Sequence, residues 1–254
     1  MTSDAETNMG GVALALDHVG VAVHDIAAAR TAWTRAGFAP TPGGRIMLRQ
    51  GYVELLMPDA ARPSATLAAM LALGEGAHVL SLRVGAADAA AARLRRAGFA
   101  TEVMENARPG EAAGGFTARF RRVPLTDALP RLQLIEHLTP EAVWHPDLIA
   151  QPNGALALEE AVVIADPPAT FAARLSRVAG RGLTPADGGF LLRLDQGAVR
   201  VVNPDAFRSQ WPGAGAPGSL PRVAALVLRG TAAASLHFPE LCLRILAPAG
   251  IAPG

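Results

Sequence analysis

Three side chains with metal-binding chemistry occur at related places in the sequence. His18 opens an apolar, strand-like run within LDHVGVAVHDIAAARTAWTRAGF, residues 16–38. His78 opens a similar run within AHVLSLRVGAADAAAARLRRAGF, residues 77–99, and Glu54 lies in the middle of the strand-like segment GYVELLMP. Imidazole nitrogens and carboxylate oxygens are ligands of first-row transition metals. Polar residues at equivalent strand positions of a repeated unit therefore suggest a metal-binding cup.

Each of these residues also has a structural explanation. A single histidine at the start of a strand is commonly a hydrogen-bonded structural residue, although two at equivalent positions favour a shared function. Glu54 lies between apolar neighbours, and an unpaired buried carboxylate there would cost several kcal/mol. It needs a cation, a hydrogen-bond donor or water. A metal cup and a metal-free cup that binds a ligand directly both remain open.

The first stretch predicts a strand, a helix and a hairpin. The strand covers residues 16–23, and the helix begins after Asp25, a favourable N-cap, and ends at Gly37. Two short strands, RIMLRQ and YVELLM, then meet at Gln50–Gly51, which is typical of a tight hairpin. The unit has the order strand, helix, strand, strand.

Three further units with the same order follow. The second has a strand over 78–84, a helix beginning at Asp88, and strands around FATEVME, FTARFRRV and RLQLIEHL. The third begins at residue 157, and its hairpin LLRLDQGAVRVVNP aligns with the hairpin of the first unit. The fourth is shorter, with strands over 223–230 and 240–248 and a small helix or loop in TAAASLHF between them. The chain therefore reads as an internal repeat.

Composition divides the chain into four parts. Residues 1–11 are polar and are predicted to form a disordered tail. Residues 12–138 contain the first two units and form the predicted first domain, followed by a linker over 139–154 that carries three prolines and an Asn-Gly pair. Residues 155–254 form a second domain, a degenerate copy of the first.

The bulk properties exclude several classes of protein. The 254 residues are 50% hydrophobic and 18% charged, which indicates a globular protein. A net charge of +1 gives no reason to expect nucleic acid or an anionic membrane as partner. One cysteine, Cys242, excludes an intramolecular disulfide and a cysteine-rich metal site. The N-terminus lacks the order of a signal peptide, and no apolar run approaches the ~20 residues of a membrane span, so we expect a cytoplasmic protein.

The segments LDHVGVAVHDIAAARTAW, GYVELLMP, HVLSLRV and LQLIEHLTPE resemble the vicinal oxygen chelate superfamily, in particular its glyoxalase-like branch. The superfamily includes glyoxalases, bleomycin resistance proteins and extradiol dioxygenases. The resemblance implies an α+β fold in which tandem βαβββ modules form bent mixed sheets around a cup. Four modules in two pseudo-domains would account for the repeat. In this family the first and last strands of each module supply the ligands of a divalent metal.

By this resemblance His18, Glu54 and His78 match three metal ligands, and the fourth falls in RLQLIEHL. Alternate residues of a strand share a face, so Gln133 and His137 should face the cup. We rank Gln133 first as the fourth ligand, then His137, then Glu136, which reaches the cup only if a bulge intervenes. Ni, Zn, Fe, Mn or Co would suit such a set, and a cup without metal remains the alternative.

The C-terminal copy offers a different set at the equivalent positions. One acid, two guanidinium groups and an apolar residue cannot hold a divalent cation. Arginines there would either pair with the acid or lie at a module interface, or bind a carboxylate or phosphate. The residues are Glu160, Arg200, Val223 and Arg244.

The resemblance implies a metal-dependent enzyme of the lyase or isomerase type. Its substrate would be a small oxygenated molecule that chelates the metal, and Glu54 would be the proton-transfer base. One alternative is a non-catalytic protein that binds or sequesters a small molecule, and a second is a ring-cleaving dioxygenase. The expected partners are a small-molecule ligand and a second copy of the chain in a homodimer.

Overall fold

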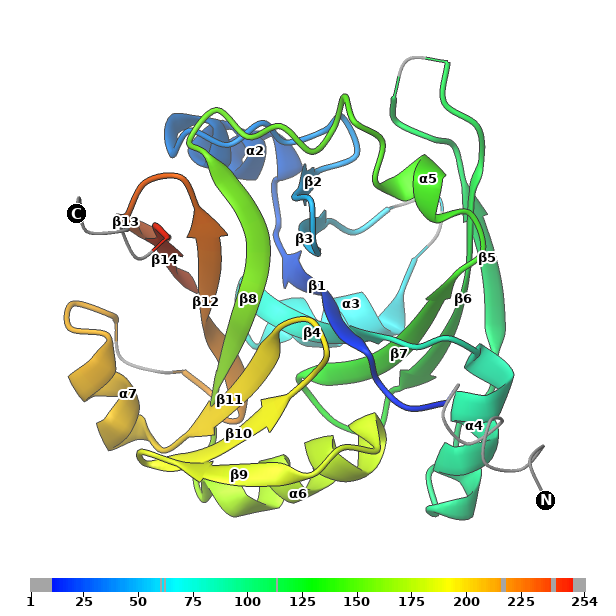
Figure 1. Ribbon diagram of the computed structural model, residues 1–254, viewed down its shortest axis with the longest axis vertical. Helices are drawn as coiled ribbons and strands as arrows, with labels where there is room; N and C mark the ends of the chain where they lie inside the picture. The colour runs from blue at the N-terminus through cyan, green and yellow to red at the C-terminus, as the bar shows by residue number, and fades with distance from the viewer. Residues whose placement is uncertain are drawn as a thin grey trace, which may run out of the picture.

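The computed structural model describes residues 11–59, 61, 63–112, 114–215, 218–238 and 241–248. Of the predicted disordered tail, only Gly11 lies within the described residues. Fourteen strands among the described residues form one curved sheet, and helices α2, α4, α6 and α7 lie on the outside of the molecule around it (Figure 1). Each helix among the described residues is too short or too polar to span a bilayer.

The N-terminal half begins with a strand, a helix and a short hairpin, as the sequence predicts. A second helix then leads into a second unit of the same kind, which begins with its own strand. The elements are β1 (Ala15–Ala22), α2 (Ile26–Arg35), β2 (Arg45–Met47), β3 (Tyr52–Leu56), α3 (Ala65–Ala72), β4 (Gly76–Arg83), α4 (Ala87–Arg96), β5 (Met104–Arg108), β6 (Ala118–Leu125), β7 (Arg131–His137) and α5 (Pro140–Val143).

The C-terminal half repeats the order of strand, helix and hairpin, and then ends in three strands. The elements are β8 (Ala155–Ile164), α6 (Pro168–Ala179), β9 (Leu183–Ala186), β10 (Gly189–Arg193), β11 (Ala198–Val202), α7 (Pro204–Gln210), β12 (Arg222–Gly230), β13 (Ala234–Phe238) and β14 (Leu241–Leu246).

One pairing pattern recurs along the sheet. A leading strand pairs in parallel with the last strand of its own unit in β1–β3, β4–β7, β8–β11 and β12–β14. Leading strands also pair with each other antiparallel, β1 with β4 and β8 with β12. A single pair, Val223 with Ala77, connects β12 to β4 and so joins the two halves into one sheet. The predicted α+β class with βαβββ-like elements is confirmed.

Helices α2 and α4, which follow the strands β1 and β4, are capped in different ways. Asp25 caps α2 as predicted, because its Oδ1 accepts from the amides of Ala27 at 2.8 Å and Ala28 at 3.0 Å. Asp88 was expected to begin α4 but lies in its first turn. The Glu136 side chain from β7 accepts from the amide of Ala87 at 2.8 Å instead. A distant carboxylate therefore replaces the local cap of α4.

One connection differs from the sequence prediction, and a helix forms in a segment for which no element was predicted. TAAASLHF was expected to be a small helix or loop, but Ala234–Phe238 forms β13. Its alternating residues pair along β14, and this tertiary pairing outweighs the helix propensity of alanine. The segment before β4 contains helix α3, which Ser64 caps at 3.2 Å and whose Met70 packs beneath β1.

The hairpin of each half contacts the leading strand of the other half. The amide of Leu158 in β8 donates to Gln50 O at 2.9 Å, and the amide of Leu16 in β1 donates to Gln196 O at 2.9 Å. Gly51 and Gly197 follow the two glutamines and have φ values of +70° and +82°. The matched hairpins of the sequence repeat are therefore among the contacts between the halves, and we call these hairpin contacts the seam.

Replacing Gly197 by Ala should destabilise this seam by about 1–3 kcal/mol, because a β-carbon is strained at positive φ and meets a neighbour. The new atom would lie 3.0 Å from Leu16 Cβ. Gly98 is a matched control, since its φ is +85° and an added Cβ there meets nothing within 4 Å. Urea unfolding measures both. An equal loss in Gly98→Ala and Gly197→Ala would show that the seam is not tightly packed.

Candidate functional site in the N-terminal half

A cavity of about 230 Å³ opens on the sheet of the N-terminal half, between β1, β3, β5, β6 and β7. We call it the cup. The sequence predictions His18, Glu54, Gln133 and His137 all line it. Arginines, aromatic rings and aliphatic side chains complete the wall, and the full lining is His18, Tyr52, Glu54, Leu56, Asn106, Arg108, Phe120, Arg122, Arg131, Gln133, Ile135, His137 and Val143.

A buried carboxylate beneath the cup holds both of its histidines. Asp17 is 1% exposed, and its Oδ1 lies 2.7 Å from His18 Nδ1 while its Oδ2 lies 3.0 Å from His137 Nε2. The β1–β4 register shifts between Leu16 and His18, so a bulge at Asp17 turns two consecutive side chains to one side. An ionised carboxylate only accepts hydrogen bonds, so both of these ring nitrogens donate to Asp17.

The charge of Asp17 is stabilised by these two rings. Burial alone would raise the pKa of this carboxyl group. The charges and hydrogen bonds of His137 and His18 outweigh burial and bring the pKa of Asp17 well below its ordinary value of 3.8. Asp17 is therefore ionised at neutral pH, and it fixes the orientation of His18 and His137.

The other nitrogen of His18 is already hydrogen-bonded. Ser81 Oγ on β4 lies 2.8 Å from His18 Nε2, and Gln133 Nε2 lies 2.5 Å from Ser81 Oγ and 3.3 Å from His18 Nε2. Because Asp17 fixes the proton on Nδ1, Ser81 donates to Nε2 and Gln133 donates to Ser81. The Ser81 hydroxyl is fully buried and does not line the cup, so it orients His18 and is not placed to attack a ligand.

Tyr52 covers the inner wall of the cup. Its ring stacks on His18 with centroids 4.5 Å apart and planes 21° apart. Burial, with the neighbouring charges of Glu54 and Asp17, raises the pKa of Tyr52 well above its ordinary value. The phenol therefore stays neutral and can donate a hydrogen bond to a ligand.

Glu54 faces His18 but is paired with an arginine. Its Oε1 lies 2.6 Å from an Arg45 guanidinium nitrogen, and its Oε2 lies 3.9 Å from His18 Nε2. Arg45 also binds Glu111 at 3.0 Å. This pairing supplies the partner that a carboxylate among apolar neighbours requires.

Three further arginines line the cup, and two of them have no carboxylate partner among the described residues. Arg108 lies 3.6 Å from Glu111, and Arg122 donates to the Asn106 amide oxygen at 2.8 Å. Arg131 forms no hydrogen bond or ion pair with the described residues through its side chain, and its Nε is buried without a partner. Burial and the nearby charge of Arg122 lower the pKa of Arg131 to about 10. A half-buried guanidinium whose Nε is shielded from water usually has a partner, so this group indicates an anionic ligand.

His78 does not reach the cup, so the predicted ligand set His18, Glu54 and His78 is not brought together. Its Nε2 lies 2.9 Å from Gly74 O, and its side chain lines a separate small hollow with Leu73 and Leu129. Alternate residues of β4 share a face, and His78 is an odd number of residues from Ser81, whose side chain contacts His18. The sequence alignment placed His78 at this position, whereas the structure places Ser81 there.

Glu136, the third-ranked alternative for the fourth ligand, is also outside the cup. It lies on the opposite face of β7, where it caps α4 and approaches Arg121 at 3.6 Å. The strand alternation correctly placed Gln133 and His137 on the face of β7 that lines the cup, together with Arg131 and Ile135.

The side chains of the cup do not fit a tightly bound divalent metal. His18 Nε2 accepts from Ser81, and the only carboxylate of the lining, Glu54, is paired with Arg45. Among the described residues, no group of three or more His, Cys, Asp or Glu side chains could hold a metal ion. The unpaired charge of Arg131 would repel a divalent cation. A metal would have to displace these contacts, and Glu54 is the only carboxylate of the lining that could then bind it.

The equivalent positions of the C-terminal half are closed by an ion pair. Arg200 donates to both oxygens of Glu160, at 2.8 Å and 2.9 Å. This confirms the alternative in which Arg200 pairs with the acid of the same set, Glu160. Arg244 instead stacks over Trp211, 4.3 Å from the ring centroid, and donates to Gln210 O at 2.9 Å.

Several site residues were missed by the sequence reasoning. Asp17 immediately precedes His18 in an apolar strand, and an acid at such a position signals a buried charge with a partner. Ser81 carries no comparable signal, because it becomes a site residue only through strand pairing. Arg131 adjoins Gln133 on the cup face of β7, so alternation would have included it.

Comparison with solved structures supports the fold. A hypothetical protein from Staphylococcus aureus superposes with a TM-score of 0.68 at 11% identity, covering 92% of this chain and 99% of its own. A mutant homoprotocatechuate 2,3-dioxygenase from Brevibacterium fuscum gives 0.51 at 12% identity, covering 93% of this chain and 72% of its own. At such identities the likeness shows the fold alone.

A third structure covers about half of this chain. Methylmalonyl-CoA epimerase from Streptomyces coelicolor is 26% identical over 48% of this chain and 94% of its own, with a TM-score of 0.37. A comparison with curated proteins gave no match. A family profile described as a glyoxalase-like domain matches residues 16–179, more than half of the chain. The protein therefore belongs to the glyoxalase-like domain family of the vicinal oxygen chelate superfamily.

Proposed function

We propose that the protein binds a small organic anion in the cup and needs no divalent metal to do so. Arg131 carries this proposal, because its half-buried side chain has no ion-pair partner among the described residues and lines the cavity. Arginine binds carboxylates and phosphates through parallel hydrogen bonds. The cavity of about 230 Å³ limits the ligand to a small molecule.

The charges around the cup support an anion. Arg45 is shared by Glu54 and Glu111, and Arg108 approaches Glu111, so these four groups balance one another. Arg122 and Arg131 remain without a carboxylate partner among the described residues, and Asp17 is occupied by its two histidines. Two positive charges in a partly dry cavity attract an anion and repel a divalent cation.

The geometry favours binding over the predicted lyase or isomerase chemistry. Oε1 of Glu54, the expected base, lies 2.6 Å from an Arg45 guanidinium nitrogen, so this oxygen is not free to take a proton from a ligand. His18 Nε2 is occupied by Ser81. Of the functions that the sequence left open, a non-catalytic protein that binds or sequesters a small molecule agrees best with these contacts.

The division into domains belongs to the same proposal. Residues 12–138 would form the binding domain, and residues 155–254 a degenerate copy whose equivalent site is closed by the pair of Glu160 and Arg200. The four parallel strand pairs support four modules in two pseudo-domains. The second domain would then stabilise the first through the seam of the two hairpins.

Calorimetric titration with malonate tests the proposal, with ethylenediamine as the cationic control. We expect malonate to bind with a dissociation constant below about 1 mM, and ethylenediamine not to bind in the cup. Nickel added before malonate should leave the affinity unchanged. Binding of malonate only after a metal is added would overturn the proposal and restore the metal-dependent enzyme or the ring-cleaving dioxygenase.

Replacing His78 by Ala should leave malonate binding unchanged, because this side chain lies outside the cup, 2.9 Å from Gly74 O. His18→Ala is the matched comparison. It removes the ring that contacts Asp17, Ser81 and Tyr52, and should weaken binding by about tenfold or more through loss of preorganisation. Weakening of the same size in both variants would mean that His78 belongs to the site.

A further inference from the structure

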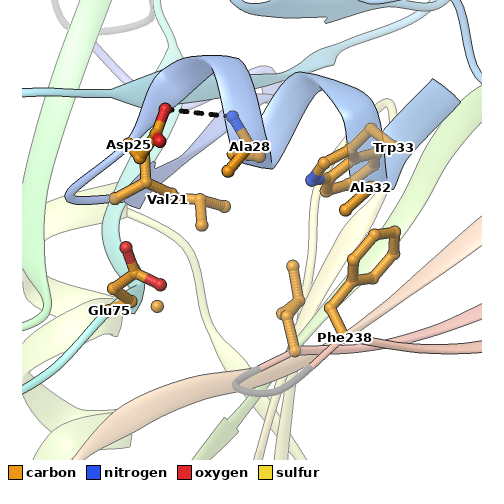
Figure 2. A pocket seen from close by; sticks show the side chains of 11 residues that line it. Val21, Asp25, Ala28, Ala32, Trp33, Glu75 and Phe238 are labelled. Carbon is orange, nitrogen blue, oxygen red and sulfur yellow. Dashed lines mark hydrogen bonds between the residues drawn. The ribbon is translucent and has the colours of Figure 1, made fainter.

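A second cavity lies on the other face of β1, between α2 and the strands β13 and β14 (Figure 2). Its volume is about 370 Å³, compared with about 230 Å³ for the cup. We call it the α2 pocket. Val21 and Val23 form part of its floor and alternate with the residues of β1 that face the cup. The two cavities are therefore separated by the sheet.

The walls of the α2 pocket are mostly apolar. Trp33 is 3% exposed, and its ring stacks on Phe238 with centroids 4.5 Å apart and planes 19° apart. Ala28 and Ala32 face the pocket from α2, and their small side chains leave the space open. The Trp33 indole nitrogen forms no hydrogen bond with the described residues, and Figure 2 shows it on the pocket side of the ring. An indole donor that is open to a pocket is available to a bound ligand.

Two carboxylates stand at the opposite end of the pocket from Trp33 and Phe238 (Figure 2). Asp25 uses Oδ1 to accept from two backbone amides, and Glu75 uses Oε1 to accept from the amide of His24 at 2.5 Å. The second oxygen of each carboxylate forms no hydrogen bond with the described residues, and neither group has an ion pair there. The pocket therefore has one anionic end and one aromatic end.

We propose that the α2 pocket binds a small apolar molecule that carries a cationic amine. The ammonium group would lie between the free oxygens of Asp25 and Glu75. The apolar body would lie along Ala28 and Ala32 against the rings of Trp33 and Phe238. Apolar walls with a few polar groups that fix orientation are the usual design of a small-molecule site. The charge of this site is opposite to that of the cup.

The proposal is tested with three probes of one shape and different charge: phenylbutylamine, phenylbutanol and phenylbutanoate. Tryptophan fluorescence and calorimetry should show that the amine binds most tightly and the carboxylate most weakly in this pocket. Asp25→Asn keeps the helix cap, since asparagine caps as well as aspartate, and removes the charge. This variant and Glu75→Gln should each weaken amine binding by about fivefold.

Filling the pocket supplies an independent test. Ala28→Leu with Ala32→Leu should abolish amine binding, whereas Ala27→Leu on the exposed side of α2 should leave it unchanged. Arg131→Met, which alters only the cup, should also bind the amine normally. Equal affinity for the amine and the carboxylate would overturn the proposal. So would undiminished amine binding by the filled variant, with circular dichroism showing that each variant is folded.

Discussion

Replacing Arg131 by Met should abolish malonate binding and at the same time stabilise the free protein. The Arg131 side chain is half-buried with its Nε unpartnered among the described residues, and burial and the charge of Arg122 lower its pKa to about 10 from 12.5. That shift corresponds to an unfavourable free energy on the order of 3 kcal/mol for the charged form. Methionine fills a similar volume without a charge, so the free energy of unfolding should rise by about 1–2 kcal/mol. Calorimetric titration and urea unfolding measure the two effects.

Opposite changes in binding and stability distinguish a ligand-binding arginine from a structural one. Arg193 is an exposed control, and Arg193→Met should leave malonate affinity unchanged and stability within about 0.5 kcal/mol. If Arg131→Met destabilised the protein by more than about 1 kcal/mol, the guanidinium would have a structural partner and the argument for an anion would fail.

Replacing Asp17 by Ala should cost about 3–5 kcal/mol of stability, because both histidines lose the carboxylate that orients them. Asp17→Asn keeps the shape of the side chain and one acceptor, and it should cost less than Asp17→Ala. Malonate binding should weaken in both variants, because the orientation of His18 and His137 is lost. Normal stability in Asp17→Ala would show that this buried carboxylate is not required.

The lowered pKa of Asp17 also predicts how the free energy of unfolding falls at acidic pH. The pKa of Asp17 in the folded protein is below its ordinary value of 3.8, so the unfolded chain takes up the proton first as the pH falls. Its stabilising contribution is complete above about pH 5 and is lost as the pH drops through 3.8 and below. Urea unfolding between neutral pH and pH 3 should therefore show a shallower loss in Asp17→Asn than in the wild type. Parallel curves would contradict the assignment.

Much of the fold follows from local patterns in the sequence. Asp25 before an alanine-rich run predicted the start of α2, and the Gln-Gly pairs predicted both hairpins. Residues 234–238 were mistaken for a helix or loop, because their strand forms by pairing with β14, which a local pattern does not contain. The seam between the halves was likewise not predicted, since it depends on how two distant hairpins meet the leading strands.

The candidate site shows the same division between local and long-range information. Alternation along β7 correctly placed Gln133 and His137 on the cup face, because the strand is regular. In β1 a bulge turns Asp17 to the same side as His18, and a simple period of two cannot reveal it. On β4 the alignment selected His78 for its residue type, but the register places Ser81 beside His18. Residue type suggested a metal, whereas the pairing of strands brings arginines to the cavity.

The most direct measurement is a crystal structure of the protein grown with both malonate and nickel, with data collected at the nickel edge. The account predicts malonate bound by Arg122 and Arg131, with no anomalous peak beside His18 and Glu54. An anomalous peak about 2.1 Å from His18 Nε2, with Glu54 turned away from Arg45 to bind it, would contradict the account. It would show that the cup is a metal site after all.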